Sequence, residues 1–170
     1  MAVVLLRAWS GKHTARTVFD SDVDEFTVDG LFDKLRGKRN VALVVVTEDG
    51  DVFGVFYRVA VTEQWKTFFD PNIFIFSFES HGRCRRGQRF VAAPELTGDV
   101  GVEFGRFDPD GWLVLVSGCS GALYLGNDWM NTHGYELSGD FEGLEDTTLT
   151  GAVGWDSPAH SRRFLALQLS

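Results

Sequence analysis

The sequence predicts a mainly β protein with little helix. Its 170 residues include 19 Gly and only 4 Pro, together with 15 Phe, 5 Trp and 3 Tyr. Aromatic residues favour strands and glycines favour tight turns, so this balance suits many short strands better than a helical bundle. The length lies within the usual range of one domain, about 100 to 200 residues. We therefore expect a single β-rich domain over residues 1–170.

A predicted β-hairpin gives the clearest local signal. Residues 41–46 and 52–57 are two β-branched and aromatic runs, and the segment between them contains Asp49-Gly50. Asp-Gly tolerates the positive φ angles of tight turns, so we expect the two runs to pair antiparallel across residues 48–51. Both runs are apolar at nearly every position, whereas a half-exposed strand alternates. The hairpin is therefore expected to be covered on both faces.

Further strands are predicted where short apolar runs are bounded by turn-forming residues. Pro71 fixes the entry to the aromatic run at residues 73–78, and a short strand at residues 90–93 ends before Pro94. The remaining runs lie at residues 102–104, 112–116, 122–125 and 163–169. We expect a turn at residues 108–111, and loops at residues 126–147 because polar, acidic and glycine residues dominate there.

Residues 29–37 are the stretch with a convincing helical pattern. Leu31, Phe32 and Leu35 recur at helical spacing, Asp29 can cap the N-terminus, and Gly37 suits the C-terminus. We expect a short amphipathic helix that packs its apolar side on a sheet.

The charge distribution argues against a nucleic-acid partner. The chain has a formal net charge of −8 and a pI near 4.9, whereas binding to nucleic acid depends on neutralising phosphates with Lys and Arg. Acidic residues gather at 20–29 and 136–146, and basic residues at 34–39 and 83–89. An electrostatic partner would therefore meet separate patches of charge.

Cysteine usage fits a reducing compartment, and the apolar runs are short. Two cysteines, Cys84 and Cys119, cannot form a disulfide framework and lack C-x-x-C spacing. The apolar run at residues 3–6 is too short for a signal peptide, and no run approaches the roughly 20 apolar residues of a transmembrane helix. We expect a cytoplasmic protein with no transmembrane segment.

Several motifs, taken in order, resemble those of the TLDc domain family of oxidation-resistance proteins. They are Leu5-Leu6-Arg7-Ala8, T-E-D-G-D-V-F-G-V-F-Y at 47–57, D-P-N-I-F-I-F-S at 70–77, Leu123-Tyr124-Leu125, Tyr135-Glu136-Leu137 and Leu149-Thr150-Gly151. Each motif is short, but together they span almost the whole chain.

The resemblance implies both a fold and a function. The fold is two antiparallel β-sheets packed as a sandwich with a few short helices. The family is linked to protection against oxidative stress and, for several members, to association with the vacuolar proton ATPase. The resemblance therefore implies a non-catalytic binding or regulatory domain that needs no cofactor. It also implies a protein partner, with vacuolar proton ATPase subunits as candidates and a peripheral location at vacuolar or lysosomal membranes through that partner.

Two departures from the family pattern concern glycines. Gly54 is followed by Val55 where the family has paired glycines, and residues 118–122, Gly-Cys-Ser-Gly-Ala, replace a longer glycine run. If this region contacts a partner, binding is expected to differ in this chain. Gly118 and Gly121 are therefore candidate interaction residues.

The cysteines support an alternative function, a thiol-dependent peroxide-consuming or redox-sensing protein. Cys119 lies between glycines that would let a substrate approach, although no spacing places a histidine beside it. The simpler interpretation of Cys119 is a small buried hydrophobic residue. Cys84 is flanked by Arg83 and Arg85, cations that favour a reactive thiolate. The simpler interpretation of Cys84 is an ordinary thiol in a solvated basic loop.

Arginines and one aromatic residue give two candidate interaction loops. Arg83, Arg85 and Arg86 supply donors for an anionic partner, although such charge runs are often only solvated surface. The second loop contains the candidates Asn127, Asp128 and Trp129, where an aromatic side chain in a polar segment offers contact area.

Two acidic features complete the candidates. Glu136 lies among apolar neighbours, so we expect backbone N–H groups to bind its carboxylate and to organise loops at one end of the sandwich. Asp20, Asp22 and Asp24 match the start of an EF-hand loop, but Glu25 stands where that loop requires glycine. We therefore expect no metal site.

Overall fold

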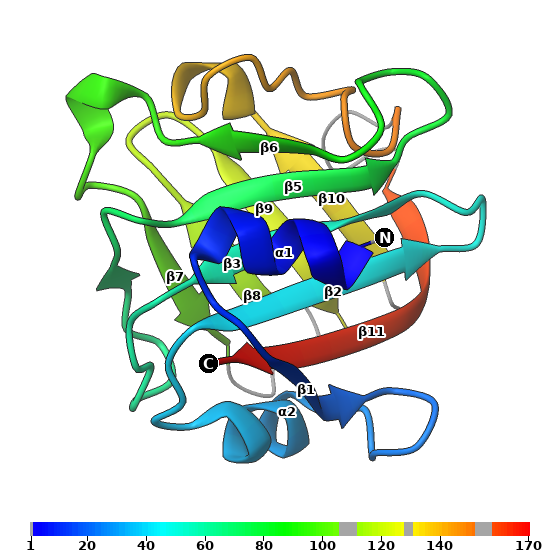
Figure 1. Ribbon diagram of the computed structural model, residues 1–170, viewed down its shortest axis with the longest axis vertical. Helices are drawn as coiled ribbons and strands as arrows, with labels where there is room; N and C mark the ends of the chain where they lie inside the picture. Colours follow the sequence, from blue (N-terminus) through cyan, green and yellow to red (C-terminus); the bar gives the residue numbers. More distant parts are fainter. Residues whose placement is uncertain (1, 106–111, 128–130, 152–157) are drawn as a thin grey trace.

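The computed structural model describes residues 2–105, 112–127, 131–151 and 158–170, and these residues form a two-layer β structure (Figure 1). The helices are α1 (Ala2–Ser10) and α2 (Val28–Leu35), with 3₁₀ turns η1 (Pro94–Leu96) and η2 (Leu137–Gly139). The strands are β1 (Ala15–Asp20), β2 (Val41–Thr47), β3 (Val52–Tyr57), β4 (Phe68–Phe69), β5 (Phe74–Glu79), β6 (Gln88–Val91), β7 (Gly101–Phe104), β8 (Trp112–Ser117), β9 (Ala122–Asn127), β10 (Asn131–Tyr135) and β11 (Ala159–Leu169).

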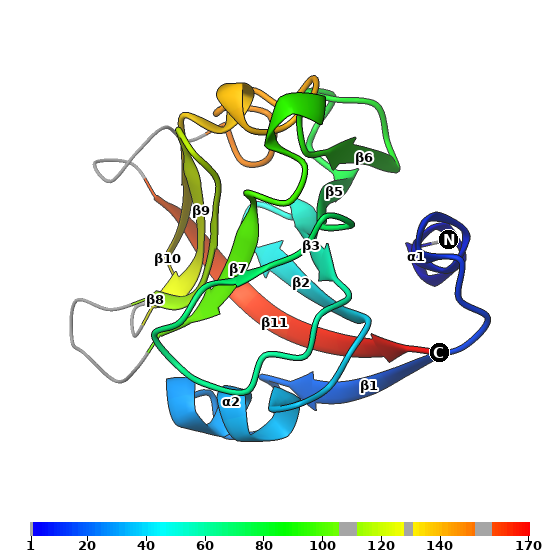
Figure 2. The ribbon, with the colours of Figure 1, turned by 90° about the vertical axis from the view of Figure 1, so that its left-hand side faces the viewer.

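Two antiparallel sheets face each other (Figure 2). The first has the order β1-β11-β2-β3-β5-β6, and the second has the order β4-β7-β8-β9-β10. The short pairing of β10 with β11, Thr132 opposite Ala159, joins the sheets along one side. The predicted class, a mainly β sandwich with a few short helices, is confirmed.

The main core fills the space between the sheets. It takes Leu43, Val55 and Ile75 from the first sheet and Val114 and Leu125 from the second, all essentially inaccessible to solvent. Helix α2 lies across one open end of the sandwich, at the bottom of Figure 2, and adds further apolar side chains to this core. The sandwich thus buries its inner faces against each other.

A second apolar cluster lies on the outer face of the first sheet, beneath α1. Phe56, Phe74, Phe76 and Phe78 of the outer face are buried there, and the ring of Trp9 stacks on Phe78 with 6.0 Å between centroids. Strands β2 and β3 are therefore covered on both faces, as the sequence predicts. Helix α1, which lies in front of the first sheet in Figure 1, provides the outer cover, because Leu6 and Trp9 pack on these aromatic rings.

The helix predictions need two corrections. Thr27, rather than Asp29, caps α2, since its Oγ1 accepts a 3.0 Å hydrogen bond from the N–H of Gly30. The sequence does not predict helix α1, because its residues alone form a short apolar run with no capping signal. The helix is stabilised by packing on the sheet, which local sequence does not reveal.

The strand predictions are confirmed in the hairpin and corrected elsewhere. The pairing of β2 with β3 is continuous from Val41 opposite Tyr57 to Val46 opposite Val52. Strand β10 lies in residues 126–147, which were predicted as loops, and β11 begins at Ala159 rather than at residue 163. Strands β1 and β4 were not predicted. The predicted turn at residues 108–111 lies outside the described residues.

Residues 136–151, here called the cap segment, close the other end of the sandwich at the top of Figure 1. Ala92 forms an isolated antiparallel bridge with Phe141, and the N–H of Glu142 donates to the carbonyl of Val91. Phe141, Leu144 and Leu149 of the segment are buried in the main core. The cap segment therefore connects the end of β10 in the second sheet to β6 in the first.

Replacing Leu6 with alanine tests the contribution of α1. Leu6 is fully buried in the outer cluster, so Leu6→Ala should lower the free energy of unfolding by about 2 to 5 kcal/mol. Val4→Ala is the matched control on the same helix, because Val4 is 63% exposed and its truncation should change stability by about 0.5 kcal/mol or less. Urea unfolding of both variants gives the comparison. Equal losses would contradict the packing described for α1.

Candidate functional site

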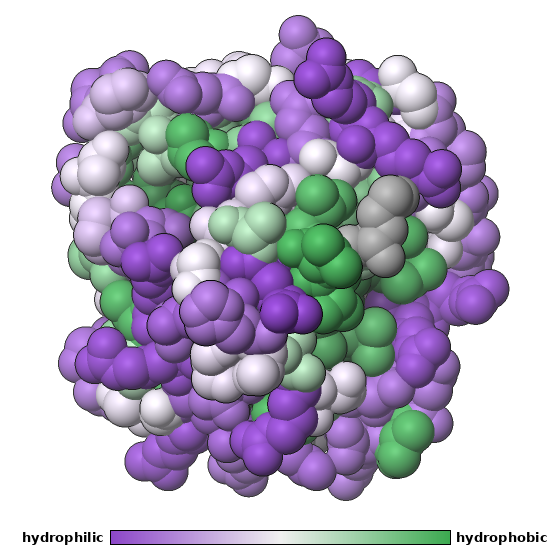
Figure 3. Space-filling view, in the orientation of Figure 1, coloured by the Kyte–Doolittle hydropathy of each residue, from purple (hydrophilic) through white to green (hydrophobic). Residues whose placement is uncertain are grey.

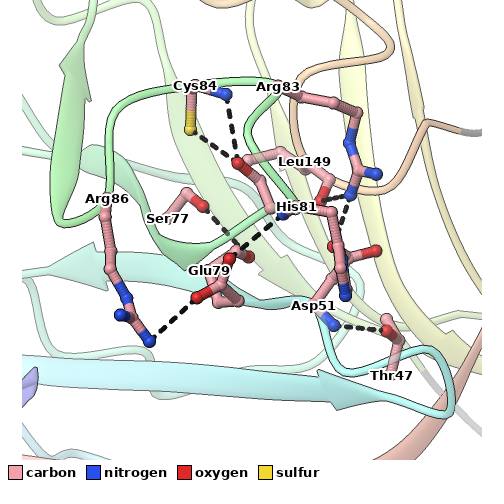
Figure 4. Close-up of polar contacts among 10 residues, drawn as sticks. Thr47, Asp51, Ser77, Glu79, His81, Arg83, Cys84, Arg86 and Leu149 are labelled. Carbon is pink, nitrogen blue, oxygen red and sulfur yellow. Dashed lines mark hydrogen bonds and ion pairs between the residues drawn. The ribbon is translucent and has the colours of Figure 1, made fainter.

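The basic loop predicted at residues 81–89 occupies residues 80–87 between β5 and β6, since Gln88 and Arg89 belong to β6. A buried aspartate fixes its shape. Asp51 has a side chain only 3% exposed, at the end of the β2–β3 turn. Its Oδ1 lies 2.8 Å from Nδ1 of His81 and also accepts a hydrogen bond from the guanidinium of Arg83 (Figure 4). A buried carboxylate is costly unless it is paired in this way. Asp51 therefore ties the loop to the hairpin.

Arg83 also binds the cap segment. Its guanidinium donates a 3.0 Å hydrogen bond to the carbonyl of Leu149. One side chain thus connects the hairpin turn, the basic loop and the cap segment. Arg83 is a candidate from the sequence, whereas the sequence pattern identifies Asp51 only as part of a turn.

Cys84 lies inside the same loop and is half-buried. Its Sγ is 3.1 Å from Oγ of Ser80, and its N–H donates to the same oxygen at 3.1 Å. Of the nearby guanidinium groups, Arg83 pairs with Asp51 and Arg86 pairs with Glu79 at 3.0 Å, whereas Arg85 is exposed. The thiol packs against the main core. The predicted influence of the arginines on this thiol is therefore not supported by direct contacts.

The outer surface of the loop carries the remaining positive charge. The side chain of Arg86 is 69% exposed despite its pairing with Glu79. Arg85 is exposed as well, and its guanidinium has no hydrogen bond or ion pair among the described residues, although its N–H donates to Gln88. Arg85 and Arg86 are thus presented to solvent on a loop whose interior is fixed.

The Gly118–Gly121 turn between β8 and β9 is built around a second buried carboxylate. Asp140, which is fully buried, accepts hydrogen bonds from the N–H groups of Ser120 at 3.0 Å and Gly121 at 2.6 Å. A Cβ at Gly118 would lie 2.5 Å from the Asp140 carboxylate, so only glycine allows this close approach. The two candidate glycines therefore have a structural role in the turn.

Cys119 lies at the tip of this turn and is exposed. The expectation of a small buried hydrophobic residue is wrong, because the turn closes on Asp140 and leaves residue 119 outside the core. Among the described side chains, neither cysteine is hydrogen-bonded to a histidine. The structure thus presents Cys119 to solvent on a rigid turn.

Glu136 does not bind the backbone as predicted. It is exposed, in the left-handed conformation with φ of 48°, at the start of the cap segment. Asp146 takes the expected role, since its carboxylate accepts hydrogen bonds from the N–H groups of Glu136 at 3.1 Å and Leu137 at 2.7 Å. A hydrogen bond with the Glu136 carboxylate raises the pKa of the exposed Tyr135 phenol.

The other predicted loop lies largely outside the described residues. Asn127 is the last residue of β9, and Asp128 and Trp129 lie outside the described residues.

Asp20, Asp22 and Asp24 form ion pairs and turn contacts. Asp20 accepts two hydrogen bonds from Arg163 of β11, at 3.0 and 2.5 Å, and these bonds hold the pKa of Asp20 below its usual range. Asp24 pairs with Nζ of Lys34 at 2.9 Å, and this pairing lowers the pKa of Asp24 as well. Within the described part of the chain, no group of three or more His, Cys, Asp or Glu side chains is placed to hold a metal ion.

The basic loop, the Gly118–Gly121 turn and the cap segment together form one end of the sandwich, here called the cap end. Asp140 connects the turn to the segment that follows β6, because its carbonyl accepts a hydrogen bond from the N–H of Ala93. Arg83 connects the loop to the same segment. Most of the described candidate residues therefore lie on loops that the cap segment holds in place. In other proteins, binding residues commonly lie on loops that a rigid scaffold positions.

The fold and this loop arrangement define a β-sandwich with ordered loops at its cap end. The family model of the TLDc domain matches residues 4–144, which is most of the chain, so the chain belongs to the TLDc domain family. A search of curated proteins finds no match to the chain. Strand β11 lies beyond the matched segment, although it pairs with β1, β2 and β10. None of the described helices is long and apolar enough to cross a membrane.

Removing the Asp140 carboxylate should loosen the Gly118–Gly121 turn. Asp140→Ala leaves the N–H groups of Ser120 and Gly121 without their acceptors, so we expect a loss of about 1 to 3 kcal/mol in the free energy of unfolding. Glu145→Ala is the control, because Glu145 is exposed in the same segment. Thiol labelling of Cys119 reports the turn directly. Unchanged stability and labelling in Asp140→Ala would contradict the role of this carboxylate.

The Asp20–Arg163 pair should make stability depend on acid. Because the folded-state pKa of Asp20 is lowered, its contribution is present above the ordinary value of 3.8 and is lost as pH falls through the lowered pKa. Asp20→Asn should therefore lower the melting temperature at neutral pH, and the difference from wild type should shrink below pH 3.8. Asp33→Asn is the control on an exposed residue. A pH-independent difference for Asp20→Asn would contradict this role of the ion pair.

Proposed function

We propose that residues 1–170 are one TLDc domain with a non-catalytic, regulatory role in protection against oxidative stress. It acts in the cytoplasm by binding a protein partner through the cap end. Membership of the TLDc family supports this role, and the family association makes subunits of the vacuolar proton ATPase the candidate partner. Binding to these subunits would place the domain at the surface of vacuolar or lysosomal membranes.

The basic loop is the observation that carries this proposal. Its inward side chains are fixed by Asp51 and Ser80, whereas Arg85 and Arg86 are exposed. A loop that is already ordered loses little conformational entropy on binding, so its exposed charges can contribute to affinity. Arginine is also enriched at the residues that contribute most to protein interfaces. The loop is therefore suited to an acidic surface on a partner.

An affinity pull-down with three forms of the domain tests this function. Wild type and Arg39→Glu, a control at an exposed arginine between α2 and β2, should recover vacuolar proton ATPase subunits from lysate. Arg85→Glu should recover much less, because it reverses the charge of the unpaired arginine in the basic loop. Recovery of no pump subunits by folded wild type would exclude this partner. Equal recovery by Arg85→Glu and Arg39→Glu would exclude the loop.

The exposure of Cys119 favours a second candidate function, redox sensing or peroxide consumption through a thiol. An exposed thiol on a rigid turn is accessible to peroxide, whereas Cys84 is half-buried beside Ser80. Oxidation by peroxide requires both access and thiolate character. Accessibility therefore favours Cys119 as the reactive position.

Peroxide consumption by wild type, Cys84→Ser and Cys119→Ser distinguishes the two thiols. If Cys119 is the reactive thiol, Cys119→Ser should abolish consumption and sulfenic acid trapping, and Cys84→Ser should retain both. Identical rates in all three forms would rule out a thiol-dependent activity and leave the binding function.

A further inference from the structure

A groove separate from the basic loop lies between the end of α1 and the first sheet. Its volume is about 330 Å³, and its walls include Trp9 from α1, Phe74 from β5 and Pro94 from η1. Figure 3 shows this face, where apolar residues are visible among polar ones at the upper left of the molecule. Arg58 and Arg89 also line the groove. The groove thus combines an aromatic wall with two cations.

The two arginines are held in place by backbone and ring contacts. Arg89 donates a 3.2 Å hydrogen bond to the carbonyl of Trp9 and lies 5.8 Å from the centroid of the Phe74 ring. Arg58 donates a 3.1 Å hydrogen bond to the carbonyl of Ser10. These acceptors are neutral carbonyl groups. Among the described residues, no ion pair joins either guanidinium to a carboxylate. Two positive charges therefore face one groove in a chain with a net charge of −8.

Arg58 has an additional unsatisfied donor. Its Nε is buried and has no hydrogen-bond partner among the described residues. The nearby Asp70 carboxylate is already engaged, since its oxygens accept the N–H groups of Arg58 and Asn72. A buried donor without an acceptor is unfavourable, but this Nε is itself inaccessible to solvent, so Arg58 contributes to the groove through the charge of its guanidinium. Arginine pairs preferentially with planar carboxylates through two parallel hydrogen bonds.

We propose that this groove binds a short acidic segment of a protein partner, with a carboxylate between Arg58 and Arg89 and a neighbouring aromatic side chain against the half-buried ring of Trp9. The two cations complement the carboxylate, and the Trp9 ring complements the aromatic side chain. The groove is open and of a size for one or two side chains. Glu142 also lines it and opposes an anionic ligand, which limits the affinity. This inference rests on the proposed protein-binding function and adds a second contact site.

Two dipeptides that differ only in charge test the proposal. The probe is N-acetyl-aspartyl-phenylalanine amide, and the control is its asparaginyl analogue, each titrated to millimolar concentration into ¹⁵N-labelled wild type. The aspartyl peptide should shift the side-chain N–H signals of Trp9, Arg58 and Arg89, and the asparaginyl peptide should bind several-fold more weakly. Equal binding by the two peptides, or no shifts at these groups, would overturn the proposal.

Two variants with opposite expected effects control for folding. Arg89→Gln should weaken binding of the aspartyl peptide by roughly two- to fivefold, the range of an exposed charge pair. Glu142→Gln should strengthen it by a similar factor, which a damaged fold cannot do. Thermal unfolding checks both variants, because Arg89 also contacts α1. If Glu142→Gln leaves the affinity unchanged, the carboxylate of the aspartyl peptide does not bind in this groove, and the proposal is wrong.

The groove can be tested independently of the vacuolar proton ATPase and against a lipid ligand. The titration uses no native partner, so it can succeed even if the pull-down excludes the pump. Co-sedimentation with phosphatidylserine vesicles tests a lipid ligand. Vesicle binding that Arg89→Gln removes, in the absence of dipeptide binding, would replace the peptide proposal with a lipid site.

Discussion

The structure depends on the burial of both faces of the first sheet. Strands β2, β3 and β5 are apolar on each side, and a sheet of this kind is stable in water only when two separate layers cover it. The second sheet covers the inner face, and α1 covers the outer face. The groove beside Trp9 exists because α1 is short and ends above Phe74, where Arg58 and Arg89 hold its last carbonyl groups. The cover of the sheet therefore also creates a candidate binding surface.

Buried carboxylates hold the polar loops in place at the cap end of the sandwich. Asp51 and Asp140 are each almost inaccessible to solvent, and each binds a loop distant in sequence. A buried carboxylate fixes geometry strongly, because any arrangement that leaves it unpaired is costly. Two such anchors hold the basic loop and the Gly118–Gly121 turn while the loop arginines and Cys119 remain exposed. Rigid loops with exposed functional groups are what a binding domain requires.

The sequence predicts those features that depend on local pattern. The hairpin of β2 and β3 was predicted with its turn and its double burial, because β-branched runs and Asp-Gly encode both locally. Helix α1 and strand β10 were missed, since their sequences have weak local preferences and are stabilised by partners distant along the chain. The site divides in the same way. Arg83, Arg85 and Arg86 stand out by charge, whereas Asp51 and Asp140 are single acidic residues whose importance comes from burial. The exchange of roles between Glu136 and Asp146 likewise arises from the fold of the cap segment.

The motifs identify the family, whereas the geometry around Cys119 shows what the glycine-containing turn does in this chain. The segment that replaces the family's glycine run keeps Gly118 and Gly121, and here these glycines serve the turn around Asp140 rather than an open approach to a substrate. Cys119, the residue between them that most suggested catalysis, is exposed and has no hydrogen bond to a histidine among the described side chains. A nucleophile normally needs a partner base within hydrogen-bond reach. The described geometry therefore leaves exposed side chains on ordered loops at the cap end, as the proposed binding function requires, and the two cations of the groove form the second surface proposed above.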